Sequence, residues 1–155
     1  MRPMIRAVRD ASRRFKSAEA AHDIVKMEAA SEKAWNSLTI IFETLRNEED
    51  QGRLDSIHMA KPTGYIVNGI NIEDQQAMIV ERKLDRSHST LGVMSLRDAL
   101  NKIAHHDTSQ ITYRIDRRGA HYLILGGAFR GKIWLAEILV SKLVKHAAAA
   151  AEAIR

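Results

Sequence analysis

Apolar residues in the first third of the chain recur at the spacing of an amphipathic helix. From Ser31 onward the positions follow at intervals of four, three, four and three residues, the pattern of a helical packing seam: Ser31, Trp35, Leu38, Phe42 and Leu45. No glycine or proline interrupts the chain between Pro3 and Gly52. The pattern predicts a long helix over about residues 4–47, which a break near Ser17 or at residues 29–31 would divide.

The middle of the chain predicts two shorter helices. Asn71 with Asp74 fits a capping box that opens a short helix through about residue 84. Ser95 with Asp98 fits a second capping box. The helix that it opens, through about Asp107, carries one apolar arc made of Leu96, Ala99, Leu100, Ile103 and Ala104. Between Gly52 and Ile70 the chain has little pattern, and Lys61-Pro62-Thr63-Gly64 is typical of a turn.

The period changes after Asp107. Ile111, Tyr113 and Ile115 alternate with polar residues, which is a strand pattern. A turn at residues 116–119 and a return at residues 121–125 complete a β-hairpin over about residues 111–125. The last segment, about residues 129–154, is apolar nearly all round, so we predict a final helix at the centre of a bundle.

These elements predict a mainly α protein. We expect a helical bundle of four to five helices with one β-hairpin, at about residues 111–125, before the C-terminal helix. A chain of 155 residues is long enough for one domain with a real core, so residues 1–155 are expected to form a single domain.

Composition limits where the protein works. The chain has no cysteine, which excludes disulfides, thiol catalysis and thiolate zinc sites and fits a reducing compartment. The longest apolar run, residues 133–140, is broken by Glu137 and is far shorter than a membrane span. The N-terminus shows no secretory signal. We therefore expect a cytoplasmic protein without a membrane partner.

The net charge of +5 is concentrated at the N-terminus. Residues 1–16 hold six basic residues and one acidic residue, so this segment accounts for the whole excess. Five of the six form a stripe at helical spacing: Arg2, Arg6, Arg9, Arg13 and Lys16. The stripe can be a solvated helix face, an electrostatic footprint for phosphates, or an organelle presequence. Three arginines add positive charge to the predicted hairpin: Arg114, Arg117 and Arg118.

Two familiar motifs are excluded. Residues 126–132 have the glycine and lysine spacing of a phosphate-binding P-loop, but Ile133 stands where a Ser or Thr must hold Mg²⁺. His105, His106 and Asp107 are consecutive, so on a helix they diverge by about 100° each and cannot converge on one ion. We therefore expect no metal and no cofactor.

One row of polar side chains carries plausible chemistry. Arg97, Asn101 and His105 are spaced four residues apart and line up beside the apolar arc of their helix. An imidazole can move a proton at neutral pH, and a guanidinium can stabilise charge on a phosphate. Together they would suffice for metal-independent RNA cleavage by the ribose 2′-hydroxyl. The alternative is that the row is only the polar border of an amphipathic helix.

The segment LRDALNKIAHH, followed by a hairpin and GKIWLAEIL, resembles small bacterial proteins of the HEPN type. Asn101 to His105 is similar to the Asn-x-x-x-His half of the family's Arg-Asn-x-x-x-His motif. Leu100 occupies the place of the family's arginine, and Arg97 is the nearest arginine before it. The resemblance implies a helical bundle, a homodimer with the motifs of both subunits at one cleft, and a role in phage defence or a toxin–antitoxin-like system.

The leading hypothesis is thus a HEPN-like RNA-binding protein or metal-independent endoribonuclease. In this hypothesis His105 is the general acid/base, Arg97 stabilises the phosphate, and Asn101 orients one of these two side chains. The basic N-terminal helix and the hairpin arginines bind the RNA backbone. One alternative is a non-catalytic, dimeric interaction or regulatory module that binds a protein partner. Another is a DNA-binding accessory protein that uses the basic stripe.

Overall fold

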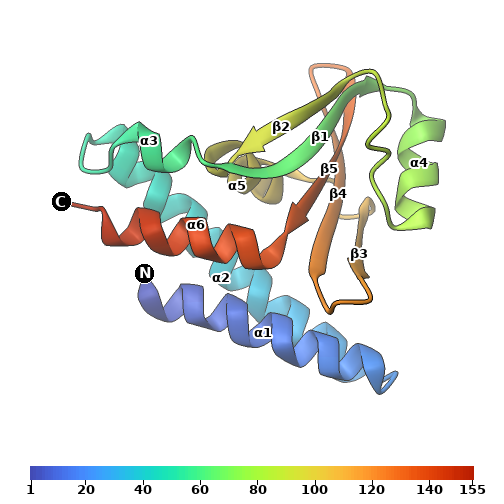
Figure 1. Cartoon of the computed structure of the whole chain (residues 1–155), viewed down its shortest axis with the longest axis horizontal. Coiled ribbons are helices and arrows are strands. Elements are labelled where there is room, and N and C mark those ends of the chain that lie inside the picture. Colours follow the sequence, from blue (N-terminus) through green and yellow to red (C-terminus); the bar gives the residue numbers. More distant parts are fainter.

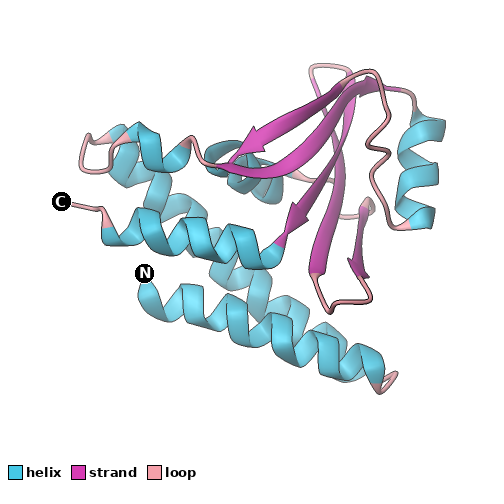
Figure 2. Cartoon of the chain, viewed as in Figure 1, coloured by secondary structure: helices cyan, strands magenta, loops and turns pink.

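The computed structural model describes all 155 residues and shows an α+β protein. Six helices accompany a five-stranded antiparallel sheet (Figures 1 and 2). The prediction of a mainly helical bundle with one hairpin is therefore wrong. In chain order the elements are α1 (Arg2–Ala20), α2 (Ile24–Asp50), α3 (Ser56–Met59), β1 (Pro62–Ile70), α4 (Ile72–Glu81), β2 (Leu91–Ser95), α5 (Leu96–His105), β3 (Ile111–Ile115), β4 (His121–Phe129), β5 (Lys132–Leu139) and α6 (Val140–Glu152).

The N-terminal helical segment is a helical hairpin. Its break lies at residues 21–23, where His22 takes a left-handed backbone conformation with φ of 54°. Asp23 then caps α2 by accepting a hydrogen bond from the Lys26 N–H. The break falls between the two places that the sequence favoured, because neither glycine nor proline marks it.

Both helix starts predicted from the capping-box pattern are confirmed, with Asn71 and Ser95 as the N-cap residues. The Asn71 side chain accepts from the Asp74 N–H at 2.7 Å at the start of α4, and the Ser95 hydroxyl accepts from the Asp98 N–H at 3.1 Å at the start of α5. The α4 helix ends earlier than expected, because Arg82 turns the chain with φ of 56°.

The sheet has the strand order β2-β1-β5-β4-β3. The predicted hairpin exists as β3 and β4, paired from Ile111 opposite Leu125 to Ile115 opposite His121. It is one edge of a larger sheet, because β5 pairs with β4 on one side and with β1 on the other. The predicted turn at Lys61–Gly64 lies instead at the start of β1, where Gly64 pairs with both Met94 and Ile138.

The predicted final helix is half strand. Its first half is β5, and only residues 140–152 are helical. Trp134, Ala136 and Ile138 belong to the core under the helices, whereas Leu135 belongs to a second core under α4. A strand covered on both faces is apolar at successive positions, so its sequence resembles that of a buried helix.

The sheet is covered unequally. Figure 1 shows α1, α2, α5 and α6 on one side of the sheet and α4 alone on the other. The larger core joins the buried faces of these four helices to the sheet, while the smaller core lies between α4 and residues such as Val67 and Ile124. None of the six helices combines the length and apolar character that crossing a membrane requires.

Close packing at Gly127 gives a test of the sheet. A Cβ added to Gly127 would lie 2.5 Å from the indole of Trp134, which is 2% exposed. We expect Gly127→Ala to lower the free energy of unfolding by about 1–3 kcal/mol in urea titrations, because the indole must move. Gly92→Ala is the matched control, since its Cβ would meet only Ile66 at 3.8 Å. Equal stability of the two variants would contradict this packing.

Candidate nucleic-acid interface

A basic groove of about 480 Å³ runs between α1, the start of α6 and the turn that joins β3 to β4. We call it the basic groove. No carboxylate lines it. Five of its lining residues are cations: Arg9, Arg13, Lys16, Arg118 and Lys145. Three separate parts of the chain thus bring positive charge to one hollow. Such a concentration of one sign of charge attracts anions.

Helical spacing brings the α1 cations into the groove. Arg9, Arg13 and Lys16 follow at intervals of four and three residues, so they share one side of the helix. The opposite side of α1 is buried through residues such as Ile5, Val8 and Phe15, which fixes the direction of the basic side.

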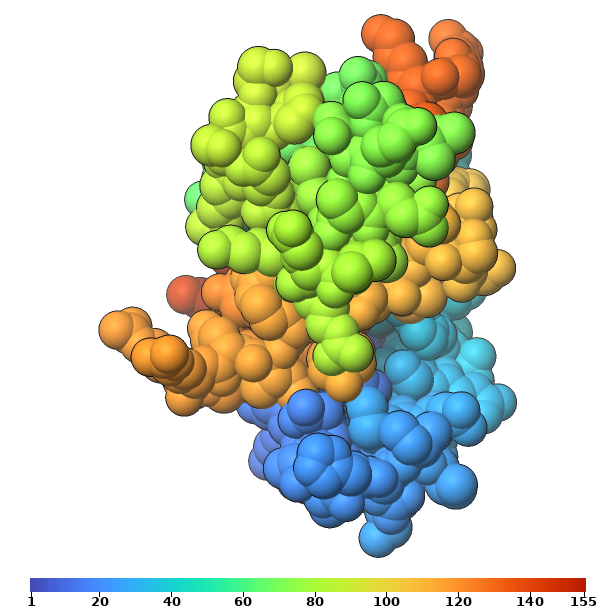
Figure 3. Space-filling model, turned by 90° about the vertical axis from the view of Figure 1, so that its right-hand side faces the viewer, coloured from blue at the N-terminus to red at the C-terminus, as the bar shows by residue number.

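The β3–β4 turn is held against α1. Lys16 Nζ donates to the carbonyl of Gly119 at 3.0 Å. Within the turn, the Asp116 carboxylate accepts from the N–H groups of Arg118 and Ala120, both at 2.9 Å. In Figure 3 the tip of this turn (orange) projects from the surface above the α1–α2 hairpin (blue). The turn therefore presents Arg118 beside α1 in a defined backbone conformation.

Most of the groove cations have no acidic partner. Arg13 forms an ion pair with Asp10, whereas Arg9, Arg118 and Lys145 form none. Arg2 and Arg6, the other members of the predicted stripe, are exposed on α1 beyond the groove. Arg117 is exposed at the hairpin turn. Of the eight predicted phosphate-binding residues, the structure thus brings three of the five on α1 and one of the three hairpin arginines into the groove, and it adds Lys145.

Arg114 differs from the other predicted hairpin cations. Its Nη1 donates to the Glu137 carboxylate at 2.8 Å, and Arg86 donates to the same carboxylate at 3.0 Å. Glu137 is 2% exposed, and burial alone would raise its pKa. Hydrogen bonds from both arginines and from the Leu84 N–H outweigh burial, so the pKa of Glu137 lies below its ordinary value. Arg114 therefore neutralises a buried charge and is not free for phosphate.

The polar row on α5 is only partly assembled. Arg97 is ion-paired with Glu49 and Asp50 at the end of α2. Arg97 and Asn101 line a small hollow of about 170 Å³ together with Arg46. His105 does not line it and lies edge-on to the Phe42 ring, with centroids 6.2 Å apart. The guanidinium that would stabilise a phosphate is thus neutralised by two carboxylates of its own chain.

A hydrogen-bonded pair, Ser12 and His121, forms part of the wall of the basic groove. Ser12 Oγ and His121 Nδ1 are 2.8 Å apart, and the imidazole stacks on Phe15 with centroids 5.0 Å apart. Burial, helped by the nearby charge of Lys16, lowers the pKa of His121 to about 4. Sequence reasoning missed this pair, because the two residues are 109 positions apart and neither belongs to a motif.

The Ser12–His121 pair is poorly suited to nucleophilic catalysis. A histidine with so low a pKa is a weak base at neutral pH. No carboxylate or carbonyl of the protein bonds to its Nε2, so nothing orients the ring as in a catalytic triad. The pair therefore acts as a neutral polar connection between α1 and β4. No three His, Asp or Glu side chains are grouped to hold a metal ion.

Comparisons of this chain with protein-family models, with curated proteins and with solved structures found no match. The HEPN resemblance, the homodimer and the assignment of Arg97, Asn101 and His105 therefore stay predictions.

The low pKa of His121 predicts a dependence of stability on pH. The folded state binds this proton less readily than the unfolded chain, so the stabilisation is complete above the ordinary pKa of 6.5 and is lost as the pH falls toward 4. We expect wild type to lose about 3 kcal/mol more than His121→Phe between pH 7 and pH 4. Urea unfolding at several pH values measures this.

The control for the pH experiment is Ser12→Ala. It removes the hydrogen bond but leaves the imidazole buried, and burial is the main cause of the shift. It should therefore keep most of the wild-type dependence on pH. A His121→Phe protein as sensitive to acid as wild type would show that His121 is not the group responsible.

Proposed function

We propose that this protein binds RNA and contacts the phosphate backbone in the basic groove. The observation that supports the proposal best is the gathering of five cations from α1, α6 and the β3–β4 turn with no carboxylate among the lining residues. Phosphate contacts supply most of the affinity in sequence-independent recognition of nucleic acids. The groove offers such contacts without requiring the protein to break ion pairs at Arg9, Arg118 or Lys145.

The chemistry of the groove fits phosphodiesters. Arginine can donate two parallel hydrogen bonds to a phosphate, and lysine adds a mobile point charge. The positive surface continues beyond the groove, since Arg2 and Arg6 are exposed on α1. A second hollow across α1 and α2 is lined by four cations and one carboxylate: Arg13, Arg14, Lys26, Lys33 and Asp23. A strand of RNA that follows α1 would thus meet positive charge along its length.

The choice of RNA over DNA rests on the HEPN resemblance and not on the groove itself. We propose binding and not cleavage, because Arg97 is occupied by Glu49 and Asp50 and His105 lies outside the hollow that Arg97 and Asn101 share. Cleavage would require the α2–α5 ion pairs to open.

The test is salt-dependent binding of a short, fluorescein-labelled single-stranded RNA, measured by anisotropy. The double variant Arg9→Gln, Arg118→Gln should bind more weakly at every salt concentration. The slope of the logarithm of affinity against the logarithm of salt should fall by about 1.4, because each lost phosphate contact removes about 0.7.

The matched control is Arg130→Gln, Lys132→Gln. It removes the same charge at the exposed β4–β5 turn, away from the groove. If both double variants weaken binding equally, net charge and not the groove attracts the RNA. A DNA strand of the same sequence that binds more tightly than the RNA would overturn the choice of RNA.

A further inference from the structure

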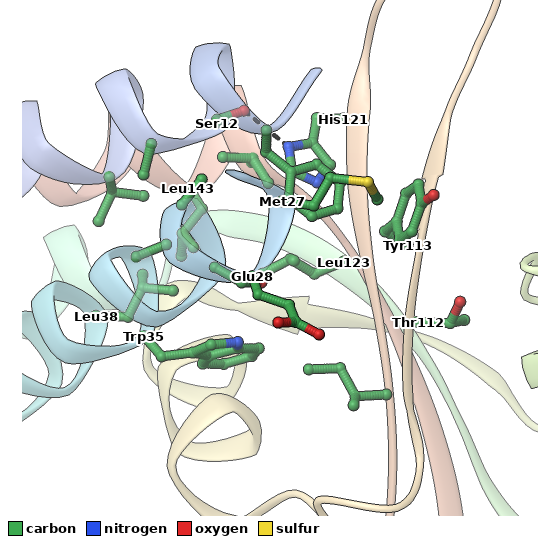
Figure 4. Close-up of a pocket in the computed structure, with 18 of the residues that line it drawn as sticks. Ser12, Met27, Glu28, Trp35, Leu38, Thr112, Tyr113, His121, Leu123 and Leu143 are labelled. Carbon is green, nitrogen blue, oxygen red and sulfur yellow. Dashed lines mark hydrogen bonds between the residues drawn. The ribbon is translucent and has the colours of Figure 1, made fainter. Parts of the chain in front are cut away.

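A largely apolar cavity lies on the other side of the Ser12–His121 pair from the basic groove. It measures about 270 Å³ and opens between α1, α2 and the β3–β4 hairpin (Figure 4). We call it the apolar pocket, because 14 of its 19 lining residues are hydrophobic. Ser12 and His121 line both this pocket and the basic groove. A concave apolar site with a few polar groups is the usual form of a small-molecule site.

Aromatic rings form the walls of the pocket and are held in place. Phe15 meets the Tyr113 ring edge-on at 4.8 Å and stacks on His121 at 5.0 Å. Trp35, across the pocket in Figure 4, stacks on His106 at 4.9 Å. These contacts preorganise the walls, so a ligand would not have to order them. Ring faces attract cations as well as apolar groups.

The charge in the pocket is negative. Glu28 is the only Asp, Glu, Lys or Arg among the lining residues. It is exposed to solvent at the pocket and makes no hydrogen bond or ion pair within the protein. Figure 4 shows its side chain reaching into the pocket from α2 beside Trp35. The hydroxyl group of Ser31 can also accept a hydrogen bond there.

We infer that the apolar pocket binds a small hydrophobic amine, whose protonated nitrogen pairs with Glu28 and whose apolar body lies among Phe15, Trp35 and Tyr113. The ligand complements both features of the site, its aromatic walls and its unpaired carboxylate. An anionic amphiphile would meet Glu28 with the wrong sign. His121 is uncharged at neutral pH, so it adds no repulsion to an ammonium group.

The site is independent of the RNA proposal, because it uses none of the groove's cations. The probe is 2-phenylethylamine, compared with 2-phenylethanol, which has nearly the same shape and no charge. Binding is followed by ¹H–¹⁵N NMR titration of the whole chain. The amine should shift resonances of pocket residues and bind at least about threefold more tightly than the alcohol.

Two variants test the role of the carboxylate. Glu28→Gln should remove the preference for the amine over the alcohol. Glu32→Gln, four residues further along the exposed face of α2 and outside the pocket, should keep it. Equal affinity of wild type for the two probes, or a preference that survives Glu28→Gln, would overturn the proposal. Shifts outside the pocket, or none at millimolar concentrations, would overturn it too.

Filling the pocket tests its location. Ala34→Phe places a ring among the lining residues and should abolish binding of both probes. Ala149→Phe makes the same substitution at an exposed position of α6 and should leave binding unchanged. Binding retained by Ala34→Phe would show that the probes bind elsewhere. If Ala34→Phe does not fold, the comparison of Glu28→Gln with Glu32→Gln still decides the outcome.

Discussion

The rest of the structure depends on burying β5 from both sides. This strand pairs with β1 and β4, contributes Trp134 to the core under the helices, and contributes Leu135 to the core under α4. It also carries the buried Glu137, which is tolerable only because two arginines and the Leu84 N–H neutralise and bond it. Because α6 begins directly after β5, the position of this strand also decides where Lys145 enters the basic groove.

The docking of α1 onto β4 then creates both candidate sites. Phe15 stacks on His121, Ser12 bonds to the same imidazole, and Lys16 holds the β3–β4 turn. These contacts join the N-terminal helix to a strand more than one hundred residues later. The basic groove lies on one side of these α1–β4 contacts, and the apolar pocket lies on the other. Neither cavity would exist in an α1–α2 hairpin alone.

Local patterns in the sequence predicted the features that local chemistry determines. The capping residues Asn71 and Ser95 and the β3–β4 hairpin follow from spacing over a few residues. The strands β1 and β5 were not predicted. The β5 strand is apolar on both faces, and β1 begins in a Pro-Thr-Gly segment that resembles a turn. The basic stripe was visible as a charge pattern. The sequence did not show that Lys145 and His121 line the groove with this stripe, because only the tertiary fold brings them to α1.

The charged residues of the two sites have opposite sign although the sites share Ser12 and His121. The groove's cations come from α1, the first half of α6 and the β3–β4 turn, while Glu28 on α2 supplies the only formal charge of the pocket. The shared wall is uncharged at neutral pH, because the His121 imidazole has a pKa of about 4. A charged imidazole would strengthen attraction for phosphate and weaken it for an ammonium group. Burial of His121 beside Phe15 therefore keeps the two electrostatic environments separate at neutral pH.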